Sequence, residues 1–182
     1  MQKNQLNIKN KVAAIQTIES YKTFIGRLDQ KRHILNEQHK DQIACINGCS
    51  ACCQVNRTVN YLEAFWLQYN YQHLSQAKKN TVVKHLSHTD TCPLLIQNSC
   101  VLYPYRPVIC RTHGLPLLYH TENQTGITFC ELNFKNRFVP FTDDNILNMD
   151  SVNLHLLQLD QKWSRNVLKT DWEGIRIAIR DL

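Results

Sequence analysis

Eight cysteines are the residues of this 182-residue chain that are best suited to chemistry. They are Cys45, Cys49, Cys52, Cys53, Cys92, Cys100, Cys110 and Cys130. In the first group of four, neighbours are separated by at most three residues, so one turn of backbone can place several thiolates about 2.3 Å from a metal ion. We therefore predict that the eight cysteines form a metal-ligand set.

The cysteine pattern leaves the kind of metal site open. Eight thiolates divide into two four-thiolate sites, which suit zinc or iron–sulfur chemistry. Alternatively, four thiolates hold one cluster and the others pack as small buried hydrophobic residues. Side chains of adjacent residues usually point in different directions, so Cys52 and Cys53 are expected to serve two sites or to bridge two metals. A disulfide framework is the competing interpretation, and the expected reducing compartment disfavours it.

Three further side chains near the later cysteines are predicted to support the metal site. Arg106 and Arg111 lie close to Cys100 and Cys110 in the sequence, where guanidinium groups could offset thiolate charge and donate hydrogen bonds to sulfur. His113 is near enough to Cys110 to replace a thiolate as ligand. The alternatives are solvated surface arginines and a histidine with a structural role.

Helices are predicted on both sides of the cysteine-bearing segments. Apolar residues recur every three or four positions over 11–44, which predicts an amphipathic helix. A second helix is expected to start at Asn60, with Glu63 completing the N-terminal signal, and to continue or restart as far as Leu86. Two further apolar stripes, the second after a capping-box pattern at 170–173, predict helices over 150–182.

The segments between these helices carry the later cysteines. Residues 91–116 contain three cysteines and four prolines, which exclude a long helix and predict an extended, looped wrap. Strand-forming residues around Cys130, over 125–134, predict a short strand or hairpin arm. The expected fold is therefore mainly α, a single domain over 1–182. Its helices clamp two cysteine-bearing loops around a metal site within a core at 45–130, with at most a short β-hairpin.

Composition limits the classes of partner and the expected location. Hydrophobic residues make up 43% of the chain, enough for one buried core. The formal charge is +6, but the basic residues are scattered and form no stripe with aromatics, so nucleic acid is not an expected partner. The sequence has neither a secretory signal nor an apolar run near the roughly 20 residues that cross a bilayer. We therefore expect a cytoplasmic protein that does not insert in a membrane.

Three stretches of the sequence together resemble a known family. They read Cys45-Ile-Asn-Gly-Cys49-Ser-Ala-Cys52-Cys53, then Cys92-Pro-Leu-Leu, then Cys100-Val-Leu-Tyr-Pro-Tyr-Arg106-Pro-Val-Ile-Cys110-Arg111. This pattern is similar to the bacterial cysteine-cluster family of the CxxCxxCC type, a zinc- or iron-chelating domain. The family is itself similar to the cysteine-rich part of flagellin lysine N-methylases, which implies an iron–sulfur cluster. No methyl-donor site is visible, so methyl transfer is not expected.

The resulting hypothesis is a metal-binding protein that holds an iron–sulfur cluster or one to two zinc ions through its cysteines. An alternative is an iron–sulfur oxidoreductase or electron carrier, which requires access to a cluster edge or an open coordination position. A weaker alternative is a zinc-dependent regulatory binding module, suggested by the positive charge. No catalytic residue is predicted, and whether the protein is an enzyme stays open.

Overall fold

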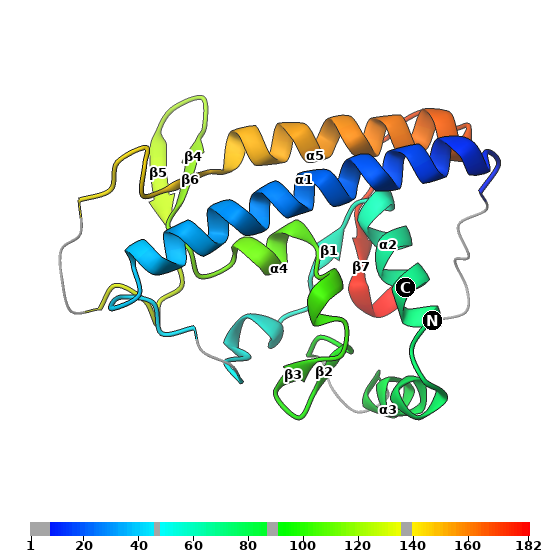
Figure 1. Cartoon of the computed structure of the whole chain (residues 1–182), viewed down its shortest axis with the longest axis horizontal. Helices are drawn as coiled ribbons and strands as arrows, with labels where there is room; N and C mark the ends of the chain where they lie inside the picture. Colours follow the sequence, from blue (N-terminus) through cyan, green and yellow to red (C-terminus); the bar gives the residue numbers. More distant parts are fainter. Residues whose placement is uncertain (1–7, 46–47, 87–90, 136–139) are drawn as a thin grey trace. The chain divides into compact units, whose positions relative to one another are not determined.

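The structure is a computed structural model that describes residues 8–45, 48–86, 91–135 and 140–182. The chain is mainly α, as predicted, with 52% of the described residues in helices and 11% in strands. The strands form three small sheets, which is more than the single short β-hairpin that the sequence predicts. Figure 1 shows the elements in sequence order by colour. Two compact units are present. Unit 1 comprises 1–19, 47–107 and 159–182, and unit 2 comprises 20–46 and 108–158.

The first predicted helix forms but is shorter than expected. Helix α1 spans Lys11–Gln38, and its start is capped by Asn10, whose Oδ1 accepts a hydrogen bond from the Ala13 amide at 3.1 Å. The chain turns at His39, where the Gln42 amide bonds to the His39 carbonyl. The buried His39 ring also bonds to the Asn145 carbonyl at 2.6 Å, which fixes the end of the helix.

In unit 1 the second predicted helix divides into two. Helix α2 (Tyr61–Gln72) begins after Asn60, whose side chain accepts a hydrogen bond from the Glu63 amide, so the predicted N-cap is confirmed. Helix α3 (Gln76–Leu86) follows after a turn. The helices thus restart rather than continue across 73–75.

A short antiparallel hairpin in unit 1 carries the Cys100 ligand candidate. Strand β2 (Leu95–Ile96) pairs with β3 (Ser99–Cys100). Gln97 and Asn98 join them with φ angles of 50° and 60°. Two positive φ values in a two-residue loop match the type I′ turn that fits the twist of a hairpin. The 3-10 turn η2 (Tyr103–Tyr105) follows directly.

The predicted helix over 170–182 is wrong. The π-helical turn η3 (Ser164–Leu168), which follows α5, ends at Lys169 with a left-handed φ of 58°, and Gly174 has a φ of 66°. The chain then forms strand β7 (Ile177–Ala178), antiparallel to β1 (Thr58–Val59), and the 3-10 turn η4 (Ile179–Asp181). The residues of β7 therefore pair with the distant strand β1 and do not follow the helical preference of their local sequence.

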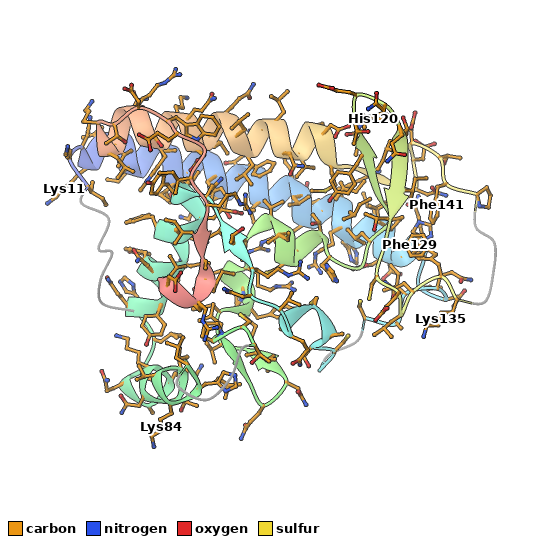
Figure 2. All side chains as sticks on the ribbon, turned by 180° about the vertical axis from the view of Figure 1, so that it is seen from behind. Lys11, Lys84, His120, Phe129, Lys135 and Phe141 are labelled. Atoms are coloured by element: carbon orange, nitrogen blue, oxygen red, sulfur yellow. The ribbon has the colours of Figure 1, made fainter. Side chains whose placement is uncertain are left out.

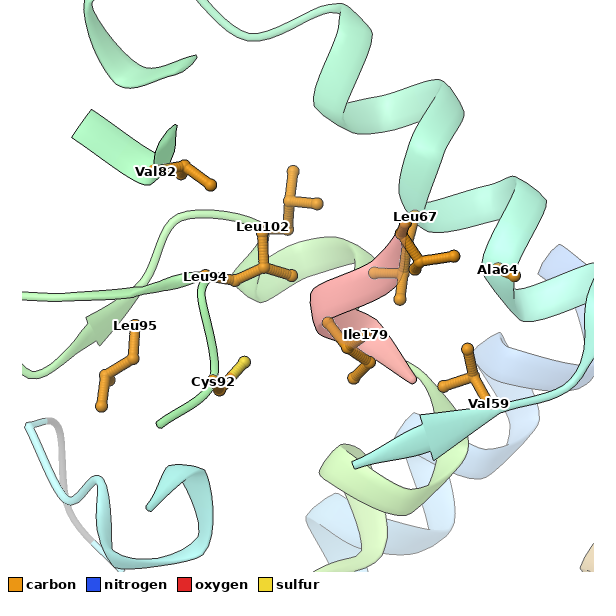
Figure 3. Close-up of a cluster of buried hydrophobic side chains, with 10 residues drawn as sticks. Val59, Ala64, Leu67, Val82, Cys92, Leu94, Leu95, Leu102 and Ile179 are labelled. Carbon is orange, nitrogen blue, oxygen red and sulfur yellow. The ribbon is translucent and has the colours of Figure 1, made fainter. Parts of the chain in front are cut away.

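The core of unit 1 joins these elements and reaches the cysteines. Figure 3 shows the buried cluster, in which the Cys92 side chain lies among apolar residues. Cys53 and Cys100 pack against its edge. Each large aliphatic side chain buried here contributes roughly 1.5–3 kcal/mol. The cluster comprises Val59, Ala64, Leu67, Val82, Cys92, Leu94, Leu95, Leu102, Ile179 and Leu182.

Unit 2 contains a three-stranded sheet and parts of two long helices. Strand β4 (Leu117–His120) pairs antiparallel with β5 (Thr125–Thr128) and parallel with β6 (Leu147–Asn148). The predicted hairpin arm over 125–134 is thus confirmed for its first four residues, and Cys130 lies beyond the strand. Helix α4 (Val108–Thr112) precedes the sheet. Helix α5 (Met149–Trp163) starts in unit 2 and ends in unit 1. The Asn148 side chain caps its start by accepting from the next amides.

None of the helices within the described ranges is both long and apolar enough to cross a bilayer.

Asp160 is a buried carboxylate that ties α2 to the C-terminal segment of unit 1. Its Oδ1 accepts a hydrogen bond from the Leu62 amide at 3.0 Å, and its Oδ2 accepts one from the Trp172 indole at 2.8 Å. Burial raises the pKa of the Asp160 carboxyl, and these two donors oppose that rise. The carboxyl is therefore easier to protonate in the folded protein than in the unfolded chain.

We expect Asp160 to make unit 1 less stable as pH rises from about pH 4, near which an unfolded aspartate titrates. Between the unfolded and the raised folded pKa of Asp160, the folded state binds more protons, so the free energy of unfolding falls with increasing pH. The Asp160→Asn variant cannot ionise and should lack this decline. Urea unfolding across the pH range measures both proteins, and parallel curves would contradict the prediction.

Candidate metal centre

The eight predicted ligands divide between the two units. Unit 1 carries Cys49, Cys52, Cys53, Cys92 and Cys100, and unit 2 carries Cys45, Cys110 and Cys130. All eight lie within the described residues, and none of them forms a disulfide.

Cys52 and Cys53 lie on the 3-10 turn η1 (Ala51–Cys53), and their sulfurs are 4.0 Å apart. The sequence pattern predicts that these side chains diverge, but the tight turn brings both sulfurs to one side. A tetrahedral ion with sulfur ligands at about 2.3 Å requires ligand sulfurs about 3.8 Å apart. The observed separation therefore suits two ligands of one ion.

The Cys92 and Cys100 segment is held against this turn by backbone hydrogen bonds. The Cys92 amide donates to the Cys53 carbonyl at 2.9 Å, which joins segments about forty residues apart. Cys100 lies opposite Leu95 in the β2–β3 pair. At the hairpin turn, the Asn98 side chain is 3.3 Å from the Ser50 hydroxyl. The Cys92 amide and the Asn98 side chain thus hold this segment against the turn that carries the vicinal pair.

The Cys92 thiol interacts electrostatically with the thiols of Cys100 and Cys52, so the three thiols lie near one another. Burial, together with smaller contributions from the charges of Cys100 and Cys52, raises the pKa of the Cys92 thiol to about 11. The backbone amides of Leu94 and Leu95 hydrogen-bond to this sulfur and act in the opposite direction. If these three thiols ionise, their negative charges repel one another. A bound cation would remove this repulsion, and the amide hydrogen bonds would help to stabilise the thiolate form.

Cys52 and Cys100 each have a nearby arginine. The pKa of the Cys52 thiol is raised by its hydrogen bond with Cys53 and by burial, whereas the Arg57 charge lowers it. Burial raises the pKa of Cys100, and Arg106 opposes this rise. Arg106 also lies over the Tyr103 ring, 3.6 Å from its centroid. Two cations therefore accompany the thiols of unit 1.

The donor set of unit 1 fits zinc or iron by its chemistry. Soft thiolates are preferred ligands of both, and the amides and arginines supply the hydrogen bonds and positive charge that such sites need. Across the described ranges, however, no three His, Cys, Asp or Glu side chains converge at the spacing of a closed metal site. Metal binding would therefore draw the thiols of Cys52, Cys53, Cys92 and Cys100 closer together.

In unit 2, Cys45 and Cys130 lie on loops that Asn133 joins. The buried Asn133 accepts from the Ala44 amide at 2.9 Å and donates to the Gly114 carbonyl at 2.6 Å. Its Nδ2 is 3.8 Å from the Cys45 sulfur, and its amide bonds to the Cys130 carbonyl. Gly114 has a φ of 100°, and a Cβ there would lie 2.9 Å from the Cys45 sulfur.

An aromatic cluster in unit 2 adjoins Cys130. The ring of Phe129 packs against Phe134 and Phe141, with centroids 4.8 and 5.9 Å apart. Phe129 and Phe141 are labelled in Figure 2. Phe134 and Phe141 both contact the buried His39 ring. These rings and the Asn133 hydrogen bonds give the Cys130 loop a defined position within unit 2.

The remaining predicted site residues of unit 2 lie on or just after α4. Cys110 is half-buried on this helix, and His113 follows the helix end. Arg111 is buried and forms an ion pair with Asp29 at 2.5 Å, and Asp29 also binds Arg32. The predicted action of Arg111 on sulfur stays a prediction, because the contact described is with a carboxylate.

The sequence pattern did not single out Arg57 or Asn133. Arg57 follows the vicinal cysteines by a few residues, and Asn133 follows Cys130 by three. Neither residue belongs to a recognisable sequence motif. The role of Arg57 depends on its contact with a main-chain carbonyl, and that of Asn133 depends on its contacts with distant loops. Nearness to a cysteine is the one clue that could have marked them.

Comparison with known proteins confirms the resemblance seen in the cysteine stretches. Residues 44–131 match the CxxCxxCC family, which is described as a putative zinc- or iron-chelating domain. This interval contains all eight cysteines and the three predicted supporting residues Arg106, Arg111 and His113. No curated protein and no solved structure matches the chain.

Proposed function

We propose that this chain is a metal-binding protein with a four-thiolate centre in unit 1, and the match of residues 44–131 to the CxxCxxCC family supports the proposal. Cys52, Cys53, Cys92 and Cys100 would hold the metal. With every ligand supplied by protein, such a centre is closed, and its binding energy contributes directly to folding. The helices and the β2–β3 hairpin of unit 1 would clamp it.

One observation carries this proposal. The vicinal turn and the hairpin bring four thiols from distant segments into one neighbourhood, where Cys52, Cys92 and Cys100 repel one another as thiolates. The raised pKa values of these thiols mean that, without a cation, they keep their protons. A bound metal ion would displace those protons and hold the thiolates as ligands.

The spacing of Cys52 and Cys53 favours a single ion, and zinc is the metal we propose. Their 4.0 Å separation is close to the edge of a tetrahedral zinc–thiolate site. An iron–sulfur cluster in the same place is the alternative that the family description also allows. An oxidoreductase or electron-carrier role would require that cluster.

The other cysteines remain proposed ligands. Cys49 is half-buried and precedes η1 in unit 1, and Cys45, Cys110 and Cys130 belong to unit 2. A second centre in unit 2 would use those three thiols with His113. A regulatory zinc module and a cytoplasmic location are both compatible with this arrangement.

Anaerobic purification followed by metal analysis and a visible spectrum tests the proposal. We expect a colourless protein with at least one equivalent of zinc. A brown protein that contains iron and acid-labile sulfide would show that the thiolates hold an iron–sulfur cluster and not zinc. Protein that stays metal-free after reduction and incubation with zinc or iron would refute metal binding itself.

A further inference from the structure

Arg57 closes the turn that carries the vicinal cysteines. Its Nε and Nη2 both donate to the Cys52 carbonyl, at 3.3 and 3.2 Å. The chain loops outward between the cysteine turn and Arg57, because the intervening residues Gln54, Val55 and Asn56 are exposed. The Arg57 side chain then extends back to the turn. The planar guanidinium fork holds one oxygen with two donors, which fixes the turn more tightly than a single donor would.

The four carbonyls of residues 50–53 all accept hydrogen bonds, and Arg57 supplies the donors for one of them. The Ser50, Ala51 and Cys53 carbonyls accept from the Cys53, Gln54 and Cys92 amides. The Cys52 carbonyl accepts from Arg57. Carbonyls at the end of a short helical turn otherwise lack partners, so removing the guanidinium leaves one free to reorient together with its side chain.

Arg57 is itself held by the C-terminal strand. Its carbonyl accepts from the Ile179 amide at 2.8 Å, and the next residue, Thr58, pairs with Ala178. Ile179 is buried in the core that includes Cys92. The guanidinium therefore projects from a fixed backbone toward the cysteine turn rather than from a free loop.

The charge of Arg57 suits this position. A divalent ion with four thiolates carries a net charge of about −2, so cations nearby stabilise the loaded site. Arg106 lies near Cys100, and Arg57 lies near Cys52. The two guanidinium groups approach the centre from different segments and together could neutralise it.

We propose that Arg57 is a positioning residue of the metal centre, which orients the Cys52–Cys53 turn through the Cys52 carbonyl and offsets thiolate charge. This inference rests on the proposed thiolate centre of unit 1. It predicts that Arg57, although it binds no metal, controls how tightly the metal is held. Loss of such a partner typically weakens metal affinity by about 10- to 100-fold.

Chelator competition on the zinc-loaded protein tests this role. We expect Arg57→Gln to release zinc at a chelator concentration about 10- to 100-fold lower than wild type. Arg57→Lys keeps the positive charge but loses the two-donor guanidinium fork. It should therefore release zinc at a chelator concentration between those of wild type and Arg57→Gln. Arg176→Gln is the matched control, because the Arg176 guanidinium binds the hydroxyl and the carbonyl of Thr58, and not the Cys52 carbonyl, and it should stay within about twofold.

Cobalt substitution adds a readout that separates positioning from general damage. Thiolate-to-cobalt absorption should weaken in Arg57→Gln and recover in part in Arg57→Lys, with far-UV circular dichroism unchanged. Zinc affinity of Arg57→Gln within twofold of wild type, or an equal loss in Arg176→Gln, would overturn the role of Arg57. If wild type binds neither zinc nor cobalt, the proposed function fails instead.

Discussion

Replacing Cys100 by serine is expected to remove one metal equivalent from the protein. Cys100 sits at the end of β3 with its thiol largely buried, beside Arg106 and within electrostatic range of Cys52 and Cys92. Serine has a similar shape but does not form a thiolate, so the centre would keep three strong ligands at most. Elemental analysis of purified protein measures the loss.

The stability of the Cys100→Ser variant should fall with its metal content. A ligand that binds only the folded state stabilises it by about 2.7 kcal/mol when present at 100 times its dissociation constant. Loss of the metal removes this contribution, and the remaining thiols bind protons in place of the ion. We therefore expect a lower melting temperature that added zinc no longer raises, whereas zinc should raise that of chelator-treated wild type.

Val101→Ala provides the control for damage to the hairpin. Val101 is the neighbour of Cys100 and packs against the same core, so its truncation disturbs packing but leaves every thiol in place. It should lower stability slightly and retain the metal. Full metal content in Cys100→Ser, or equal loss in Val101→Ala, would contradict the assignment of Cys100 as a ligand.

Cys130→Ser distinguishes one centre from two. Cys130 belongs to unit 2, where its carbonyl binds the Asn133 amide. If unit 1 holds a complete centre, Cys130→Ser keeps the metal equivalent bound there. Loss of a different metal equivalent in this variant would indicate a second centre. If Cys130→Ser and Cys100→Ser both lose the same single equivalent, the centre draws ligands from both units and the four-thiolate assignment is wrong.

The features of this protein that could be predicted from sequence are those with local causes. The N-cap of α2 depends on Asn60 and Glu63, which are neighbours in the chain, and the structure confirms it. The donor set depends on residue type alone, because few side chains other than cysteine offer a soft thiolate. Spacing within the first group also indicates a wrapped turn, and η1 is such a turn.

The features that the sequence could not reveal depend on distant partners. Residues 170–182 have a capping-box pattern and an apolar stripe, yet Ile177 pairs with Val59 and forms a strand. The β2–β3 hairpin lacks the usual glycine, and its turn uses Gln97 and Asn98 instead. The Arg57 contact with Cys52 involves a main-chain carbonyl, which leaves no pattern of residue types in the sequence.

Deletion of residues 177–182 should destabilise unit 1 and release its metal. Ile179 and Leu182 are each only 2% exposed and belong to the core cluster that contains Cys92. Removing a large buried aliphatic side chain costs about 2–5 kcal/mol, so losing two is comparable with the whole stability of many domains. The deletion also removes strand β7 and the amide that holds the Arg57 carbonyl.

Two point variants divide this effect into its parts. Leu182→Ala leaves the β1–β7 pair intact and should lower the free energy of unfolding by about 2–5 kcal/mol, with partial metal retention. Ile175→Ala is the matched control, because Ile175 lies in the same segment but is 40% exposed, and should change stability by less than about 0.5 kcal/mol. Thermal unfolding and metal analysis measure all three proteins. A deletion variant that melts like wild type with its full metal content would show that the C-terminal segment does not support the cysteine core.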